Sequence, residues 1–480
     1  MQCIKMAAHL CHCLVCKPVL WCKQLIMSCF CNQACRRFLL KVMAIYSLTF
    51  FLVLPFFFRS LPLTKYYKLY HDPLKTLDEA RRMNQEQADL AENQLFQMSK
   101  SETKMLYEKS RENAKLNLVI GIITMSRHEG SGVRRKDPRY LTQVMLALHL
   151  ALQQSGGLQD TAMFICNTNR VPEDHKEAIN LSEFFPILNK PVKREINPYE
   201  REKLDYQFCL SEASKFDARY VLLLQDDALP HRDFYSVLMY ILRNRLESHI
   251  SHGDQHVSSN DWLWLKLNFP NSLARYERNY YFATEWVSIS LVITGVGMLL
   301  LSIYREVKGH LTNTTLNGGS QSTLDHSSYY DIFLASFVYI LLVVWLLGKP
   351  YISLARMASP SLYTLGPGTS CCLPAVLFPQ SQVPGILEYL QATKLSTDNP
   401  LDFALDDYRQ KRMLRQYLLS PNIFTHIGFI STLHMLPSTK EAENYVFAMK
   451  ILKCGLMQSS KGHRTLHDQT GLKVLSQAGS

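Results

Sequence analysis

The residues best placed to do chemistry are two adjacent aspartates, Asp226 and Asp227, in the stretch YVLLLQDDALP of residues 220–230. The apolar run before them is typical of a strand buried on both faces of a parallel or mixed sheet. Open α/β sheets bind ligands beyond the carboxyl ends of their strands. Carboxylates there suit Mn²⁺ or Mg²⁺, which take the remaining ligands from water and substrate phosphates. The pair could therefore hold a cation against a nucleotide diphosphate, or it could simply form a turn.

Alternating strand and helix patterns precede the aspartate pair and must position it. Residues 116–124 (LNLVIGIIT) and 161–166 are short apolar runs that predict buried strands, and residues 140–154 between them have helical periodicity. A second helical pattern, residues 202–214, leads into the apolar run before the aspartates. This order predicts an α/β domain with a parallel sheet and helices on its faces.

Three long apolar segments, residues 38–58, 285–304 and 331–349, predict transmembrane helices. Basic residues crowd the N-terminal side of the first, which favours a cytoplasmic N-terminus and a retained signal anchor. The other two are apolar on all sides and flank a polar linker, residues 305–330, so a membrane hairpin is favoured over two buried core helices. This topology makes the linker cytoplasmic and the sheet domain luminal.

The remaining segments are assigned from their composition. Residues 1–37 are a cytoplasmic, cysteine-rich leader, whose thiols are interpreted as acylation sites or unpaired cysteines because zinc-site spacing is missing. Residues 59–115 predict an amphipathic stem helix, 116–284 and 350–437 the two parts of the sheet domain, and 438–480 a disordered tail. The net charge of +11 is spread without a dense basic run, so no nucleic-acid partner is expected.

A luminal location has consequences for cysteines and asparagines of the sheet domain. In an oxidising compartment Cys166 and Cys209 are candidates for a bridge. Cys371 and Cys372 either pair with each other or pair separately, which the sequence leaves open. Asn180, in the sequon Asn-Leu-Ser, would be accessible to glycosylation.

Several separated motifs, in order, carry a resemblance to a known family. They are YEREKLDYQFCL (199–210), YVLLLQDDALP, the membrane hairpin, SPSLY with CCLPAVLFP (359–379) and HIGFIS (426–431). The series resembles the Golgi enzymes that add N-acetylgalactosamine to GPI anchors, from about Leu116 to about Met435.

The resemblance implies both a fold and a reaction. The fold is a GT-A-like (Rossmann-type) α/β glycosyltransferase domain split by a transmembrane helix hairpin, with an N-terminal transmembrane helix in addition. The donor would be UDP-GalNAc and the cofactor Mn²⁺ or Mg²⁺. The acceptor would be the first mannose of GPI glycans on anchored proteins, modified with inversion to a β1,4 linkage at the Golgi membrane. A site held near membrane lipid would meet a lipid-anchored acceptor at a raised effective concentration.

The family's metal motif, Glu-Asp-Asp, is matched here with one departure. Asp226 and Asp227 match its two aspartates, whereas Gln225 stands at the first acidic position, which should weaken cation affinity. His426 matches a late histidine that commonly completes the metal site, and a neutral imidazole is an acceptable ligand beside carboxylates. Without the resemblance, His426 would be interpreted as a packed or hydrogen-bonded histidine.

The resemblance also implies a general base. Asp402, which precedes an apolar helix, would take the proton of the attacking hydroxyl on the face opposite the UDP. Its alternative role is as the N-cap of that helix. Asp406 and Asp407 are the fallback candidates for the base.

Three further residues are candidates for contact with the nucleotide. Arg127 and Thr124, at the end of the first strand, lie where a GT-A domain receives uridine and phosphate, and Lys203 of the EREK motif could reach the diphosphate. Each could equally be an ordinary surface residue.

Two other functions remain compatible with the sequence. The first is a transferase of the same fold with another acceptor, such as an N-glycan arm. The second is a catalytically inactive three-span membrane scaffold, which the neutral Gln225 favours.

Overall fold

The computed structural model describes residues 33–112, 115–127, 137–191, 197–247, 261–278, 280–313, 326–430 and 437–451. The chain divides into two compact units. One comprises Met1–Leu69 and Thr284–Leu346, and the other comprises Tyr70–Ala283 and Leu347–Ser480. The leader before residue 33, residues 314–325 of the hairpin linker and the chain after residue 451 lie outside the described residues.

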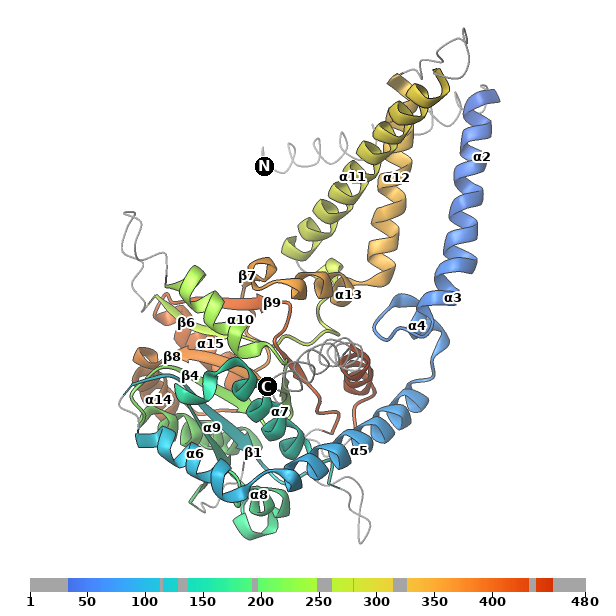
Figure 1. Cartoon of the computed structure of the whole chain (residues 1–480). Helices are drawn as coiled ribbons and strands as arrows, with labels where there is room; N and C mark the ends of the chain where they lie inside the picture. The colour runs from blue at the N-terminus through green and yellow to red at the C-terminus, as the bar shows by residue number, and fades with distance from the viewer. Residues whose placement is uncertain are drawn as a thin grey trace, which may run out of the picture. The chain divides into compact units, whose positions relative to one another are not determined.

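The first unit contains the predicted membrane spans. Within the described ranges, three helices are long and apolar enough to cross a membrane, namely Arg36–Phe58, Tyr280–Lys308 and Tyr329–Leu347. In Figure 1 these are α2 (Gln33–Leu48) with its continuation α3 (Leu54–Phe58), α11 (Tyr280–Asn313) and α12 (His326–Leu347). Large apolar side chains are exposed along all three, as on a surface that faces lipid. The prediction of three apolar spans is confirmed, and they fit a multi-pass membrane protein.

Hydrogen bonds join the three helices of this unit. The indole of Trp286 on α11 donates to the carbonyl of Leu341 on α12 at 2.9 Å. The hydroxyl of Tyr46 on α2 donates to the carbonyl of Ala335 on α12 at 2.5 Å. Such bonds matter in a bilayer because no water is present there to satisfy polar groups.

The second unit is built on a mixed sheet. Among the described residues eight strands pair in the order β3-β2-β1-β4-β8-β6-β9-β7. Their bounds are β1 Leu116–Thr124, β2 Thr161–Asn167, β3 Ile187–Asn189, β4 Ala218–Gln225, β6 Trp262–Lys266, β7 Thr364–Pro367, β8 Ala375–Pro379 and β9 Arg415–Ser420. The half formed by β3, β2, β1 and β4 is parallel, as predicted, whereas β8 runs antiparallel to β4 and β6. The parallel sheet expected from the β–α–β pattern is therefore found in the first half, and the second half makes the whole sheet mixed, with β6 and β9 parallel and β7 antiparallel to β9.

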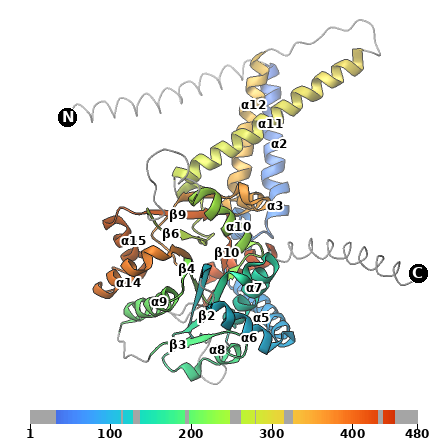
Figure 2. The same ribbon diagram turned by 60° about the vertical axis from the view of Figure 1, so that its left-hand side comes forward.

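Helices cover both faces of this sheet, and alternate residues of β1 point into two separate cores. Leu118 and Ile120 face a core shared with α5 (Pro73–Gln97), α7 (Tyr140–Ser155) and α10 (Phe234–Ile241), whereas Val119 faces α9, α14 and α15. The latter helices span Pro198–Ser214, Val383–Ala392 and Leu401–Lys411. Figure 2 shows the two groups on opposite sides of the strands.

The stem is divided into helices rather than continuous. It consists of α4 (Lys65–Tyr70), α5 and α6 (Lys100–Glu112), with a break at Met98 and Ser99. Asp72 caps α5 through a 2.9 Å bond from the amide of Leu74. Leu77 and Leu95 of α5 are buried in the core of the sheet domain, so this helix packs on it.

The expected disordered tail begins with an ordered helix. Residues 439–451 are helical, with Ala442, Tyr445, Val446 and Met449 buried. Their spacing of three and four residues is that of an amphipathic helix, a short signal that the polar composition of the whole segment conceals. The prediction for 438–480 is therefore wrong for its first part, and its remainder lies outside the described residues.

Two disulfides join cysteines of the sheet domain. Cys166 on β2 is bonded to Cys209 on α9, and Cys371 is bonded to its neighbour Cys372. Gly121 of β1 makes room for the first bridge, because a Cβ there would lie 2.9 Å from Sγ of Cys209. The candidate pair Cys166–Cys209 is confirmed, and the open question about Cys371 and Cys372 is resolved as a vicinal bridge.

We expect the two disulfides to contribute unequally to stability. The Cys166–Cys209 bridge closes a separation of 43 residues, which by loop-closure entropy corresponds to about 4 kcal/mol. The Cys371–Cys372 bridge closes a separation of 1 and should contribute far less by this mechanism. Thermal unfolding of the full chain in detergent should therefore show a large drop in melting temperature for the double variant Cys166→Ser, Cys209→Ser. The double variant Cys371→Ser, Cys372→Ser should show only a small drop. The reverse order would contradict this assignment.

Candidate active site

A cavity of about 330 Å³ opens at the carboxyl ends of β1 and β4. Its lining comes from these two strands, from α9 and from the segment that follows β10 (Phe424–His426). The strand β10 pairs with β5 (Ala228–Pro230) in a separate two-stranded sheet, with His426 opposite Ala228. This pairing brings a histidine from late in the chain beside the aspartate pair.

Asp226 and Asp227 lie at the predicted place, directly after β4. The strand end is fixed by backbone bonds from Gln225 to the carbonyl of Pro374 at 2.8 Å and from Asp226 to that of Ile123 at 3.1 Å. Both aspartates are buried, with 4% and 1% of their surface exposed. The turn geometry and a ligand-sized cavity therefore occur together at this edge of the sheet.

Arg127 neutralises the two aspartates from the loop after β1. Its guanidinium forms ion pairs with Oδ1 of Asp226 and Oδ2 of Asp227, and Nη1 also donates to the carbonyl of Ile430 at 3.2 Å. The guanidinium lies 5.5 Å from the ring centre of Tyr140. Burial alone would lower the pKa of Arg127, but the two carboxylates raise it above its ordinary value. Two buried carboxylates at adjacent positions are tolerated because this cation is shared between them.

The carboxylate of Asp226 is fully engaged with its surroundings. One oxygen is paired with Arg127, and the other accepts from Oγ1 of Thr124 at 2.8 Å and from the amide of Met125 at 3.4 Å. Thr124 is further held by Nε2 of His175 at 2.8 Å. Burial raises the pKa of Asp226, Arg127 opposes this, and Asp227 adds to it, so that the pKa is about 6. Thr124 and Arg127 thus belong to the site, where they position carboxylates.

Asp227, in contrast, has one carboxylate oxygen that is not hydrogen-bonded to any described residue. Its Oδ2 meets Arg127 and, at 3.2 Å, Nε2 of His426, while its Oδ1 is buried without a hydrogen-bond partner among the described residues. Burial would raise the pKa of Asp227, but Arg127 and His426 hold it below the ordinary aspartate value. An ionised, buried and incompletely satisfied carboxylate oxygen is costly unless a ligand completes it.

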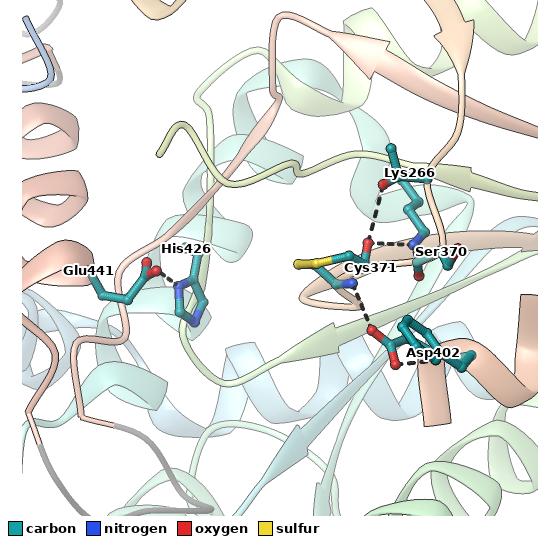
Figure 3. The surroundings of a disulfide bond; sticks show 9 residues. Lys266, Ser370, Cys371, Asp402, His426 and Glu441 are labelled. Atoms are coloured by element: carbon teal, nitrogen blue, oxygen red, sulfur yellow. Dashed lines mark hydrogen bonds and ion pairs between the residues drawn. A yellow bond between two sulfur atoms is a disulfide. The ribbon is translucent and has the colours of Figure 1, made fainter. Parts of the chain in front are cut away.

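Glu441, which no sequence motif indicated, contacts His426 at Nδ1, the ring nitrogen that Asp227 does not contact. Its Oε2 lies 3.4 Å from Nδ1 of His426 and accepts from Asn444 at 2.9 Å (Figure 3). Burial lowers the pKa of His426, yet Asp227 and Glu441 together raise it to about 10. Glu441 belongs to the 439–451 helix, so recognising the amphipathic spacing of that helix would have been the signal needed to find it.

Gly428 allows the segment after His426 to approach the aspartates. A Cβ at this position would lie 2.0 Å from Oδ2 of Asp227 and 2.9 Å from Nη1 of Arg127. These two atoms belong to the Arg127–Asp227 ion pair, so a side chain at residue 428 could fit only if that ion pair moved. The glycine of the HIG motif is therefore a packing requirement of the site.

Lys203 does not reach the cavity, so the expectation of a diphosphate contact is wrong for this residue. Its Nζ donates to the carbonyl of Thr393 at 2.7 Å and pairs with Glu200 at 2.7 Å, and the side chain is buried. It holds α9 against the end of α14. The nearby Arg201 lines the cavity instead, and its guanidinium forms no hydrogen bond or ion pair with any described residue.

Asp402 lies beside the cavity rather than in its lining. It is in the first turn of α15, where the N-cap is Pro400, so the N-cap alternative is wrong. Its Oδ2 accepts from the amide of Cys372 at 3.3 Å, next to the loop that Lys266 holds through the carbonyls of Ser370 and Cys371 at 2.7 Å (Figure 3).

The fallback residues for the base are committed elsewhere. Asp406 is bonded to Arg409, Gln410 and Ser370, at 2.7, 2.9 and 3.2 Å. Asp407 is paired with Lys411 at 2.6 Å and accepts from Tyr389. Neither contributes to the described lining of the cavity.

The described residues contain no group of three histidine, cysteine, aspartate or glutamate side chains arranged around a metal. The predicted metal donors differ in whether they have an atom without a hydrogen-bond or ion-pair partner among the described residues. Asp227 and His426 face each other with one free carboxylate oxygen, whereas both oxygens of Asp226 are occupied. Two protein donors fit a cation that takes its other ligands from a diphosphate and water. His426 can be the second of them only after it gives up the proton that its raised pKa favours and turns Nε2 away from Asp227.

These features define a membrane-attached α/β protein with an acidic, ligand-sized cavity at the carboxyl edge of its sheet. The chain matches the family model described as GPI-N-acetylgalactosamine transferase PGAP4 over residues 118–425. The match covers more than half of the chain and extends across the membrane hairpin, so the chain belongs to this family of glycosyltransferases. The resemblance noted in the sequence is confirmed.

We expect Gly428→Ala to disable the site without unfolding the protein. The added methyl group must displace the Arg127–Asp227 pair, and a displacement of about 1 Å in positioned groups can cost about 100-fold in rate. Gly366→Ala is the matched control, because a Cβ there meets only the carbonyl of Leu418, at 3.9 Å. Transferase activity and thermal unfolding of both variants would be compared with wild type. Full activity in Gly428→Ala would contradict the close approach described here.

Proposed function

We propose that this protein transfers N-acetylgalactosamine from UDP-GalNAc to the first mannose of GPI anchors, with inversion to a β1,4 linkage, at the Golgi membrane. The observation that carries the proposal is the buried, unsatisfied Oδ1 of Asp227 beside His426 in a member of this family. An ionised carboxylate oxygen of this kind, at the carboxyl edge of an α/β sheet, suits a cation and the diphosphate of a nucleotide sugar.

The strand order supports a GT-A-like assignment of the domain. The parallel half, β3-β2-β1-β4, is of the Rossmann type, and the acidic pair follows its β4 strand. The strands added after the hairpin run partly antiparallel and carry the second half of the site. A nucleotide would enter at the ends of β1 and β4, where the cavity opens.

We assign the metal to Asp227 and His426, and the positioning of the loop after β1 to Asp226. Mn²⁺ (or Mg²⁺) held there would supply Lewis-acid neutralisation of the leaving diphosphate. Gln225 lines the same cavity, and its neutral side chain leaves Asp227 as the carboxylate on which the cation depends. Arg201, which lines the cavity with a free guanidinium, replaces Lys203 as the candidate for diphosphate contact.

The three spans and the sheet domain are consistent with a luminal enzyme whose N-terminus is cytoplasmic. The two disulfides fit an oxidising compartment. A membrane-attached transferase would meet a lipid-anchored glycan at a higher effective concentration than it would meet a soluble one.

The donor and acceptor can be tested directly with the full chain purified in detergent. UDP-GalNAc, UDP-GlcNAc and UDP-Gal would be offered with a mannose-containing GPI glycan or a high-mannose N-glycan, and the products identified by mass spectrometry and NMR. We expect transfer of GalNAc to the GPI glycan, as a β-linked product. Preference for the N-glycan would favour the other-acceptor alternative, and no transfer to any acceptor would favour the inactive scaffold.

The division of roles between the two aspartates predicts different effects of the same substitution. Asp227→Asn removes the charged oxygen offered to the cation and should weaken Mn²⁺ binding in the presence of UDP by more than about tenfold, because even indirect partners of metal ligands can contribute that much. Asp226→Asn should weaken Mn²⁺ binding less but lower the melting temperature, since it disturbs Arg127 and Thr124. Calorimetry of Mn²⁺ binding would measure the difference. Equal affinities in Asp227→Asn and wild type would contradict the assignment.

A further inference from the structure

The wall of the cavity that α9 forms carries acidic side chains to which the sequence motifs assigned no role. Glu202 and Asp205, one turn apart on α9, both line the cavity. Asp205 is paired with Lys190 at 2.7 Å, and both partners are buried. Glu202 has no hydrogen bond or ion pair with any described residue, although Asp205 and Arg201 are close enough to affect its charge. One carboxylate on this wall is therefore structural, and the other is available to a ligand.

Asp402, on α15, lies close to Glu202 but has different contacts. Its carboxylate already accepts from the amide of Cys372 and does not line the cavity. The neighbouring residue Leu401 does line it, so α15 touches the cavity through an apolar side chain. Asp402 therefore contacts the disulfide loop, whereas Glu202 lines the cavity and has no hydrogen bond or ion pair among the described residues.

We propose that Glu202 is the general base of the transfer reaction and that Asp402 is a positioning residue that acts through it. This inference rests on the proposed function. In the step, the acceptor hydroxyl gives its proton to the Glu202 carboxylate as its oxygen forms a bond to the anomeric carbon. The bond from that carbon to the phosphate oxygen breaks, and its electron pair leaves with UDP. The proton on Glu202 then passes to water.

The electrostatics of the wall suit this role. Burial is the main cause that raises the pKa of Glu202, the charges of Asp402 and Asp205 add to it, and Arg201 opposes it, so that the pKa is about 7. A general base is most effective when its pKa lies near the working pH. Because the base must be ionised, activity falls as the pH drops through about 7. Removing the charge of Asp402 should lower the pKa of Glu202, so that the loss of activity occurs at lower pH.

The test is the pH dependence of kcat and kcat/KM for the full chain in detergent, with UDP-GalNAc and a mannose-containing GPI glycan. We expect Glu202→Gln to lose about 10²- to 10⁴-fold in kcat, the usual range for a general base, and to lose the acidic limb of the profile while donor KM stays unchanged. Glu202→Asp should keep the limb with partial activity. Glu212→Gln, the same change on α9 away from the cavity, should resemble wild type.

The variant Asp402→Asn distinguishes whether Glu202 or Asp402 is the general base. If Glu202 is the base, this variant remains active and its acidic limb shifts to lower pH. If Asp402 is the base, the variant loses turnover while Glu202→Gln keeps its acidic limb, which would overturn the proposal. A raised donor KM with normal kcat in Glu202→Gln would overturn it too, by making Glu202 a binding residue. Absence of turnover in the wild type would instead contradict the proposed function, and the assignment of a base would fall with it.

Discussion

The buried guanidinium of Arg127 is the contact on which the rest of the site depends. Two adjacent carboxylates in a buried turn would repel each other, and each would tend to take up a proton unless a cation compensates them. Arg127 pairs with one oxygen of each aspartate and also donates to the carbonyl of Ile430. One side chain thus fixes the loop after β1, the turn after β4 and the segment after β10. The free oxygen of Asp227 is a product of that arrangement.

The site is assembled from chain on both sides of the membrane hairpin. The strands β8, β9 and β10 follow the hairpin in sequence, yet β8 lies between β4 and β6 in the sheet, and β10 pairs with β5. These pairings place His426 and Gly428 beside the aspartates. The hairpin is therefore an insertion within one compact α/β unit rather than a boundary between two domains. Such an insertion attaches a transferase to the bilayer without removing any part of its sheet.

The sequence predicted those parts of the site that depend on strand ends. An apolar run that stops at two aspartates has few alternatives to a buried strand with carboxylates at its edge. The structure accordingly has Thr124, Asp226 and Asp227 at the ends of β1 and β4, and their roles toward metal and nucleotide stay predictions. Helical residues were harder to place, because which face of a helix borders the cavity is decided by packing. Lys203 and Glu202 are adjacent on α9, yet one is bonded to the carbonyl of Thr393 and the other lines the cavity. Glu441 was missed because its helix is short and follows a polar stretch.

A structure of the full chain with UDP and Mn²⁺ would show whether the cavity between the aspartate turn and α9 is the donor site. We expect the diphosphate in this cavity, with Asp227 and His426 as the residues that hold the cation and Arg127 still between the two aspartates. A second cavity, of about 450 Å³, lies beside α6, α8 (Lys176–Leu181) and β3 and offers a clear alternative. Nucleotide bound there, with no ligand beside Asp227, would contradict the account.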